Sequence, residues 1–200
     1  MIKLKASELR TTTASEENKQ QLKKNPIYII VDNVLDTYNT GSIFRLADAV
    51  SAERVYLCGK TEIPPHTRIK KASINTTEWV NWEYCSTAVE AIEKVRQQFS
   101  TRPSDRGKLE QYSSSDPAFR ENREVQVVSI EQSEKSIPYD QIDYSFPVAL
   151  IVGHESDGVS QAAIDASDYV AELPMWGVNK SLNVMVSLGI ILYKVMEGKK

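Results

Sequence analysis

Ala171-Glu172-Leu173-Pro174-Met175 and, after a short loop, Ser181-Leu182-Asn183 lead directly into a long apolar segment that ends near Met196. Polar residues rarely stand this close to apolar runs without a partner, because a buried polar group left unpaired costs about 1–3 kcal/mol. A second turn, Gly153-His154-Glu155-Ser156-Asp157-Gly158, follows another apolar run upstream. We expect these two turns to form the functional site.

The chain upstream of these turns alternates between patterns typical of strands and of helices. Residues 27–31 and 54–58 are β-branched and aromatic runs that predict buried strands. Between them, apolar residues at helical spacing from Ile43 to Val50 predict a helix with Ser42 as its N-cap. Further strands are expected at residues 79–85, 125–130, 148–152 and 169–173, and further helices after Thr87 and Ser160. The alternation predicts an α/β fold on an open, mostly parallel sheet with helices on both faces.

Three segments stand apart from this alternation. Residues 182–196 are apolar on nearly every side, so we expect a final helix buried inside the fold or against another subunit. Residues 1–26 are polar and end at Pro26, which predicts an N-terminal arm before a single domain at 27–200. Residues 100–124 contain almost no apolar side chains and predict an inserted, mobile loop.

Composition limits the classes of function. The 200 residues carry a formal net charge of -3, which argues against binding nucleic acid through bulk electrostatics and leaves only a local basic patch. Cys58 and Cys85 are the only cysteines and form no CxxC pair, so we expect two reduced thiols. The N-terminus lacks a signal-peptide core and no apolar run reaches the roughly 20 residues of a membrane span, so we expect a soluble, cytoplasmic protein with no membrane partner.

The stretch Asn39-Thr40-Gly41-Ser42-Ile43-Phe44-Arg45 follows the first predicted strand and therefore lies at the carboxyl edge of the sheet, where ligands usually bind. Gly41 permits a tight turn whose exposed N–H groups would favour an anion such as a phosphate. Arg45, about one helical turn on, would point its guanidinium at the same place. A capped helix with a solvated arginine explains these residues equally well.

The turn at Gly153-His154-Glu155 belongs to the same edge. Its His-Glu pair lacks the HExxH spacing of a zinc site and His66 is the only other histidine, so we expect no metal. We interpret Glu155 as a carboxylate that holds loop backbone or an arginine, with a helix cap as the alternative. Ser181 is an ordinary N-cap, whereas the amide of Asn183 needs a ligand or a backbone loop as its partner.

Taken together, these blocks closely resemble the SpoU, or TrmH-type, branch of the SPOUT methyltransferases, which methylate the ribose 2′-hydroxyl of RNA. The family's blocks are Asn-x-Gly-x-x-x-Arg, Gly-x-Glu-x-x-Gly, and Ile/Leu-Pro-Met followed by Ser-Leu-Asn. The matching residues are Asn39, Gly41 and Arg45, then Gly153, Glu155 and Gly158, then Leu173, Pro174, Met175, Ser181, Leu182 and Asn183. The resemblance covers residues 27–197, and no GxSxG, Walker A or GxGxxG pattern competes with it.

This resemblance implies an α/β knot, with a deep trefoil knot at the C-terminal end of the chain, and a homodimer whose active site lies near the subunit interface. It also implies that S-adenosyl-L-methionine binds in the knot. The residues expected to touch this cofactor are Ile130, Gly153, Leu173, Met175 and Leu182.

The resemblance also assigns catalytic roles. Arg45 would act near the target 2′-hydroxyl, either by helping to deprotonate it or by holding its phosphate. A free arginine is a very weak base, so removing the proton requires a strongly altered environment or help from the RNA phosphate. Asn39, Glu155, Ser181 and Asn183 would order the surrounding loops.

Arg68, Lys70 and Lys71 are the best local candidates for RNA phosphate contacts, although short basic runs are as often simply solvated surface. Ribosomal-RNA members of the family often carry an extra N-terminal RNA-binding domain, and the 26-residue arm is too short to build one. This favours transfer RNA over ribosomal RNA as the substrate. Family members usually have a glycine in the segment aligned with residues 72–76, and this chain has none there.

Two other functions remain open at this stage. A non-catalytic RNA-binding or assembly protein that retains the knotted fold fits the acidic balance and the altered 72–76 segment. A methyltransferase acting on a base or on a substrate other than RNA would share the same cofactor site.

Overall fold

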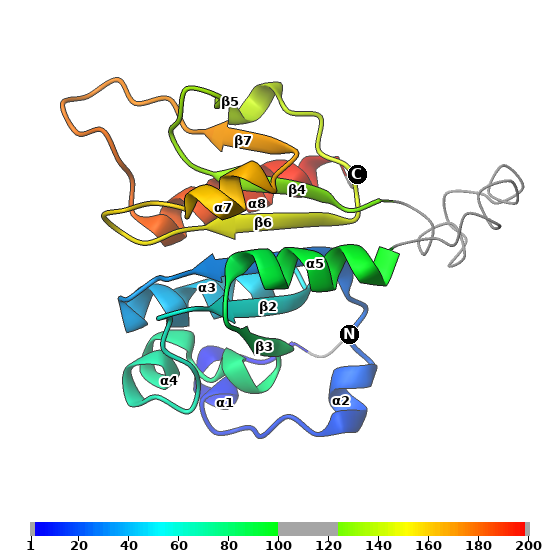
Figure 1. Cartoon of the computed structure of the whole chain (residues 1–200). Coiled ribbons are helices and arrows are strands. Elements are labelled where there is room, and N and C mark those ends of the chain that lie inside the picture. The colour runs from blue at the N-terminus through cyan, green and yellow to red at the C-terminus, as the bar shows by residue number, and fades with distance from the viewer. Residues whose placement is uncertain (1–2, 100–123, 199–200) are drawn as a thin grey trace, which may run out of the picture.

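A computed structural model describes residues 3–99 and 124–198 of the chain. Its strands form one seven-stranded sheet in the order β3-β2-β1-β6-β4-β7-β5, and every neighbouring pair is parallel (Figure 1). The strands are β1 (Asn25–Asp32), β2 (Ala52–Cys58), β3 (Trp82–Cys85), β4 (Gln126–Ile130), β5 (Ile137–Pro138), β6 (Val148–Val152) and β7 (Tyr169–Glu172). The predicted α/β class with a parallel sheet is therefore confirmed.

Helices cover both faces of this sheet because its central strands are apolar on both sides. In β1, Ile27, Ile29 and Val31 point into one core, while Tyr28 and Ile30 point into the other. The first core also takes residues of α3 (Thr37–Ala49), α4 (Thr67–Ser73) and α8 (Val184–Glu197), and the second takes residues of α5 (Ala88–Phe99) and α7 (Gln161–Asp165). None of the helices in the described ranges has the length and apolar composition needed to span a membrane.

Several predicted boundaries differ from the structure where tertiary contacts override local pattern. The strand expected from residue 79 begins at Trp82, since Thr76–Glu78 forms a short 3-10 helix. The short elements α4 and β5 and the 3-10 helix at Tyr139–Gln141 carry too few apolar repeats to be recognised from sequence. The predicted loop at residues 100–124 lies outside the described residues except for its last position.

The predicted start of α3 at Ser42 is wrong. This helix begins at Thr37 and is capped by Asp36, whose Oδ1 accepts the N–H of Tyr38 at 2.8 Å. Gly41 therefore lies inside a helix rather than in a tight turn. A Cβ at this position would lie 2.6 Å from the Cβ of Ala72 and 2.7 Å from the carbonyl oxygen of Ile69, so its missing side chain lets α4 approach closely.

The segment without the expected glycine adopts left-handed backbone conformations. Ile74 and Asn75 have φ values of 52° and 69°, a region that a β-branched residue such as Ile74 rarely occupies. Both amide hydrogens of Asn75 are bound, to the carbonyl oxygens of Leu9 at 3.2 Å and Thr12 at 3.1 Å. These bonds tie the segment to the N-terminal arm, which contains α1 (Ala6–Leu9) and α2 (Glu16–Gln20).

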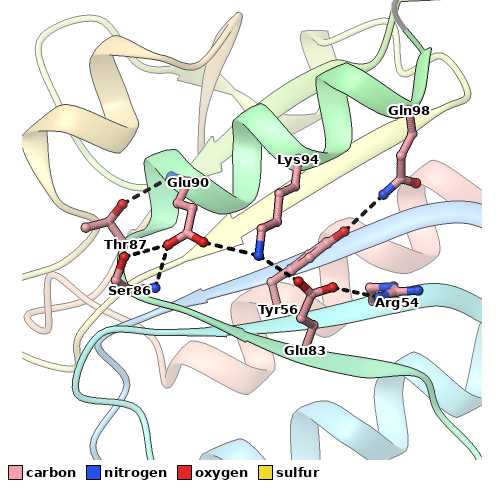
Figure 2. A network of polar contacts seen from close by, with 8 residues as sticks. All are labelled: Arg54, Tyr56, Glu83, Ser86, Thr87, Glu90, Lys94 and Gln98. Carbon is pink, nitrogen blue, oxygen red and sulfur yellow. Dashed lines mark hydrogen bonds and ion pairs between the residues drawn. The ribbon is translucent and has the colours of Figure 1, made fainter.

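A polar network joins α5 to the edge of the sheet (Figure 2). Glu83 accepts a hydrogen bond from Arg54 at 2.7 Å and from Lys94 at 2.6 Å, and Lys94 also pairs with Glu90 at 3.1 Å. Hydrogen bonds from the side chain and backbone of Ser86 lower the pKa of Glu90 to about 2. The network fixes β3, the last strand at that edge, against β2 and α5.

The close approach of α3 and α4 makes Gly41 sensitive to a single methyl group. We expect Gly41→Ala to lower the free energy of unfolding by about 2 kcal/mol, because the new Cβ would overlap backbone atoms of α4. The matched control is Gly189→Ala in α8, where a Cβ would lie 3.4 Å from Leu46 and only the helix propensity changes, a gain of up to about 1 kcal/mol. Urea unfolding of both variants gives the comparison, and equal gains would contradict the packing argument.

Candidate functional site

A cavity of about 410 Å³ lies where β4, β6 and β7 end, and both turns singled out in the sequence contribute to its wall. Carboxyl ends of parallel strands meet at one edge, which is where ligands bind in open α/β sheets. Every residue expected at a cofactor lines this cavity, namely Ile130, Gly153, Leu173, Met175 and Leu182. The structure thus brings together residues that are up to 52 positions apart (182 − 130).

The turn from Gly153 to Gly158 is closed by its own backbone. His154 and Gly158 exchange two N–H···O bonds of 3.0 and 2.9 Å, and Gly158 has a φ of 73°. A Cβ on Gly153 would overlap the backbone of Gly158 and Val159, so this glycine is required by a close approach of chain to chain.

His154 stabilises the turn. Its Nδ1 accepts the N–H groups of Ser156 and Asp157, both at 3.1 Å. The carboxylate of Asp157 also lies 3.5 Å from the same nitrogen.

Glu131 is a site residue that sequence reasoning missed. Its Oε2 accepts the N–H of Val159 at 2.9 Å and its Oε1 accepts the N–H of Gln132 at 2.8 Å. The carboxylate lines the cavity together with Glu172 from β7. An acidic residue directly after a buried strand, at the same edge as Gly153, is the signal that could have identified it.

Glu155 is the centre of a hydrogen-bonded cluster that joins three distant segments. Its carboxylate accepts the backbone N–H groups of Leu35 at 3.1 Å and Asp36 at 3.0 Å, and the side-chain amide of Asn39 at 3.0 Å. Asn39 in turn accepts a bond of 3.0 Å from the side-chain amide of Asn183. The interpretation of Glu155 as a holder of loop backbone is thus confirmed, and within the described part of the chain no arginine bonds to it.

These bonds determine the charge of Glu155. Partial burial raises the pKa of its carboxyl, but the hydrogen bonds from Asn39, Asp36 and Leu35 outweigh this effect and hold the pKa below its ordinary value. The group is therefore a carboxylate at neutral pH.

Asn183, not Ser181, caps the final helix. The Oδ1 of Asn183 accepts the N–H of Met185 at 3.0 Å while its amide donates to Asn39, so the partner is a side chain rather than a ligand or backbone loop. Helix α8 consequently begins at Val184, later than predicted. Ser181 lines the cavity and is exposed, and its N–H donates to the side chain of Asn179 at 3.3 Å.

Arg45 does not line the cavity within this chain. It follows Asn39 by six positions in α3, which places it about 120° around the helix from the Glu155 cluster. Its side chain is exposed, on the same face as the exposed Tyr38. The expected catalytic residues thus divide into three groups. Hydrogen bonds connect Asn39, Glu155 and Asn183, whereas Ser181 lines the cavity and Arg45 is separate.

The basic residues predicted to contact RNA lie on α4. Arg68, Lys70 and Lys71 are exposed there, and none of them lines the 410 Å³ cavity. Within residues 3–99 and 124–198, no group of three His, Cys, Asp or Glu side chains is arranged to hold a metal ion.

The cavity suits a small organic ligand with both apolar and positively charged parts. Its volume lies within the roughly 300–1,000 Å³ of small-molecule sites. Ile130, Leu173 and Met175 provide apolar surface, and Glu131 and Glu172 provide negative charge. The same wall also contains the amine of Lys180, the imidazole of His154 and the hydroxyl groups of Ser156, Ser181 and Ser187.

Comparison with known proteins identifies relatives along nearly the whole chain. The model of the SpoU rRNA Methylase family matches residues 26–118 and 99–193. A tRNA (guanosine(18)-2'-O)-methyltransferase of Aquifex aeolicus is 30% identical over 181 residues, covering 89% of this chain and 72% of that protein. The putative TrmH family tRNA/rRNA methyltransferase YacO of Bacillus subtilis is 26% identical, and this chain covers only 63% of its length.

Solved structures of SpoU enzymes also superpose on this chain. The A. aeolicus TrmH/SpoU tRNA modifying enzyme superposes with a TM-score of 0.67 at 25% identity, over 97% of this chain and 83% of that one. The SpoU methyltransferase AviRb from Streptomyces viridochromogenes superposes with a TM-score of 0.68 at 20% identity, over 93% of this chain and 64% of that one, which shows the shared fold.

The lowered pKa of Glu155 leads to a prediction about acid stability. A carboxyl whose pKa is depressed by folding stabilises the protein above its unfolded pKa of about 4.3, and this contribution is lost as the pH falls through the folded value. We expect Glu155→Gln to lower the free energy of unfolding by about 1 kcal/mol at neutral pH and to differ little from the wild type in acid.

Urea unfolding across the range from neutral to acid pH measures this difference. The control is Glu134→Gln, which makes the same change at an exposed glutamate outside the cluster and should leave the profile unchanged. If the difference in unfolding free energy between the Glu155 variant and the wild type stayed constant with pH, the lowered pKa of Glu155 would be contradicted.

Proposed function

The chain belongs to the SpoU methylase family, and from this premise we propose that it transfers a methyl group to a ribose 2′-hydroxyl of RNA. The observation that carries this proposal is the convergence of the Glu131, Gly153, Leu173 and Leu182 segments on one cavity beside the Glu155 cluster. Relatives named for transfer RNA and for ribosomal RNA both occur, including a 23S rRNA enzyme of Ralstonia nicotianae at 22% identity. We favour transfer RNA, for which the more similar Aquifex protein is named.

We propose that the 410 Å³ cavity holds S-adenosyl-L-methionine. This cofactor supplies an electrophilic methyl group on a positively charged sulfonium. The apolar side chains of Ile130, Leu173 and Met175 suit its adenine, and the carboxylates of Glu131 and Glu172 suit its positive charges. Gly153 belongs to the wall of the same cavity, and its missing side chain makes room for the backbone of Gly158 and Val159.

Arg45 positions the substrate in this proposal. A guanidinium stays protonated in proteins, so it is suited to binding a phosphate or the 2′-hydroxyl oxygen rather than to removing a proton. Arg45 is exposed and lies away from the cavity of its own chain. In this proposal it reaches the methyl donor bound in the cavity of a second subunit.

A homodimer would provide that interface. Helix α8 buries Leu188, Ile191 and Leu192 in the core, but Val186, Ile190 and Tyr193 are 40%, 38% and 58% exposed. Leu46 of α3 lies beside Gly189 of α8, so the exposed faces of the two helices adjoin each other. We propose that this apolar surface packs against a second copy and brings Arg45 to the partner's cavity.

The proposed C-terminal trefoil knot is supported by strand order. β7 pairs with β4 on the side away from β6, and the chain then returns to α8, which packs beside α3 next to β1. The returning segment, residues 173–183, shares one cavity with the loop at 153–158. We propose that the chain threads through this loop, one of the rare exceptions to unknotted topology.

Methyl transfer tests the function directly. Purified protein, labelled S-adenosyl-L-methionine and unmodified transfer or ribosomal RNA should yield a 2′-O-methyl nucleoside after digestion, with transfer RNA the better substrate. We expect Arg45→Ala to reduce turnover by at least about a hundredfold while cofactor affinity changes little, because Arg45 does not line the cavity.

Arg45→Lys tests whether the positive charge of this residue is enough for its role. If Arg45 binds a phosphate, the lysine variant should keep part of the activity, since the positive charge is retained. Full activity of Arg45→Ala would overturn the assignment of this residue, and failure of the wild type to bind the cofactor would favour a non-catalytic RNA-binding protein.

The dimer is tested by a charge on the exposed face of α8. We expect Ile190→Glu to give a monomer in light scattering and to lose methyl transfer, because a buried, unpaired carboxylate opposes association. Ile63→Glu is the control, since Ile63 is similarly exposed, at 40%, but lies before α4. A monomeric wild type with full activity would disprove the shared site.

A further inference from the structure

A second and larger cavity lies on the opposite half of the sheet. Its volume is about 760 Å³, and its walls come from α4, from the start of β3, from Arg54 of β2 and from Lys19 of α2. β1 separates β2 from β6 in the sheet, so the two cavities lie at least roughly 10 Å apart at the strand spacing of about 4.8 Å. The function proposed above makes no use of this cavity.

One side of the cavity is apolar and aromatic. Trp82, the first residue of β3, is only partly buried, and it lines the cavity together with Pro64, Val80 and Ile69. Aromatic side chains bind the faces of nucleic-acid bases by stacking, whatever the identity of the base. This wall is therefore suited to a flat, uncharged ring system.

The other side is polar and carries positive charge. The ammonium group of Lys70 forms no hydrogen bond or ion pair within the described residues, and Lys19 lines the cavity from the arm. Arg54 also lines it, but Glu83 neutralises this charge at 2.7 Å (Figure 2). Glu78 adds a carboxylate to the wall, and the exposed Arg68 and Lys71 on the same helix as Lys70 keep this side of the molecule positively charged.

His66 adds a hydrogen-bond donor to the wall. Its Nδ1 accepts the N–H of Arg68 at 3.3 Å as the cap of α4, which leaves the proton on Nε2. A ring-shaped ligand with an anionic group would thus find an aromatic surface, a donor and two ammonium groups in one space.

The N-terminal arm completes this cavity. Lys19 belongs to α2, and the preceding part of the arm is held in place by the two hydrogen bonds from Asn75 to Leu9 and Thr12. The left-handed conformation of Asn75 is what presents its amide to both carbonyl groups. The segment that lacks the family's glycine is therefore the one that fastens the arm.

We propose that the second cavity binds an unpaired nucleotide, with the base against Trp82 and the phosphate at Lys70. In the context of the proposed function this nucleotide belongs to the RNA substrate, and Arg68 and Lys71 on the exposed side of α4 continue the path of its backbone. A free mononucleotide offers the same chemistry. The cavity would then hold RNA at a point remote from the methyl donor and help to select the substrate.

The test uses the full chain with its first cavity saturated by S-adenosylhomocysteine, so that a nucleotide cannot report on the cofactor site. The probes are guanosine 5′-monophosphate and a single-stranded hexaribonucleotide. Binding is followed by the NMR signals of the indole N–H groups, of which the protein has three, at Trp79, Trp82 and Trp176. We expect the Trp82 signal to move with guanosine monophosphate and the exposed Trp176 to stay unchanged.

Matched variants decide whether the cavity is responsible. Lys70→Glu should weaken binding of both probes at least about tenfold, because a charge-assisted bond is replaced by repulsion. Lys60→Glu makes the same charge change at an exposed lysine outside the cavity and should have little effect. Trp82→Leu should weaken binding about tenfold through lost stacking, and retained binding of S-adenosylhomocysteine shows that each variant is folded.

Each outcome bears on the proposal. Tighter binding of the hexanucleotide than of the mononucleotide supports RNA as the ligand, and equal binding supports a site for a free nucleotide. An unmoved Trp82 signal with both probes, or equal affinities of Lys70→Glu and the wild type, would overturn the site. If the protein transfers methyl groups but binds no nucleotide in the second cavity, the proposed function is retained and the second site is rejected. If it binds the nucleotide but transfers no methyl group, the second site is retained and the proposed function is rejected.

Discussion

The rest of the site depends on the carboxylate of Glu155. It bonds to Asn39, 116 positions away, and through Asn39 it reaches Asn183, 144 positions from that residue. One charged group therefore fixes the start of α3, the turn after β6 and the first turn of α8 relative to one another. Because hydrogen bonds to a carboxylate are stronger than those between neutral groups, a single residue can hold three distant segments together. Two of these segments, the turn after β6 and the start of α8, also line the 410 Å³ cavity.

Different parts of the sheet carry different candidate sites. The carboxyl ends of β4, β6 and β7 hold the cavity suited to the methyl donor, and α3 and α8 present the exposed surface that carries Arg45. On the other side of β1, the arm, α4 and β3 enclose a second cavity with aromatic and positive walls. A net charge of -3 is compatible with RNA binding in this arrangement, since the positive charges gather locally on α4 and beside it.

Much of this architecture could be predicted from particular stretches of sequence. The runs in β1, β2 and β6 are apolar on both faces, and that pattern is specific to strands buried in a parallel sheet. The start of α3 could not be predicted, because its first turns are polar and are stabilised by Asp36 and by the Glu155 cluster rather than by apolar spacing. Gly41 was interpreted as a turn residue because sequence alone does not show that α4 lies against it.

The sequence by itself determined the fold class, the family and several of the residues at the cavity. These follow from local patterns and short motifs, which depend on neighbours a few positions apart. Only the tertiary structure decided which of these residues touch one another. It joined Asn39, Glu155 and Asn183, left Arg45 exposed on another face of α3, and added Glu131 to the site. The physical reason is that hydrogen bonds and close packing between segments far apart in the chain leave no periodic trace in the sequence.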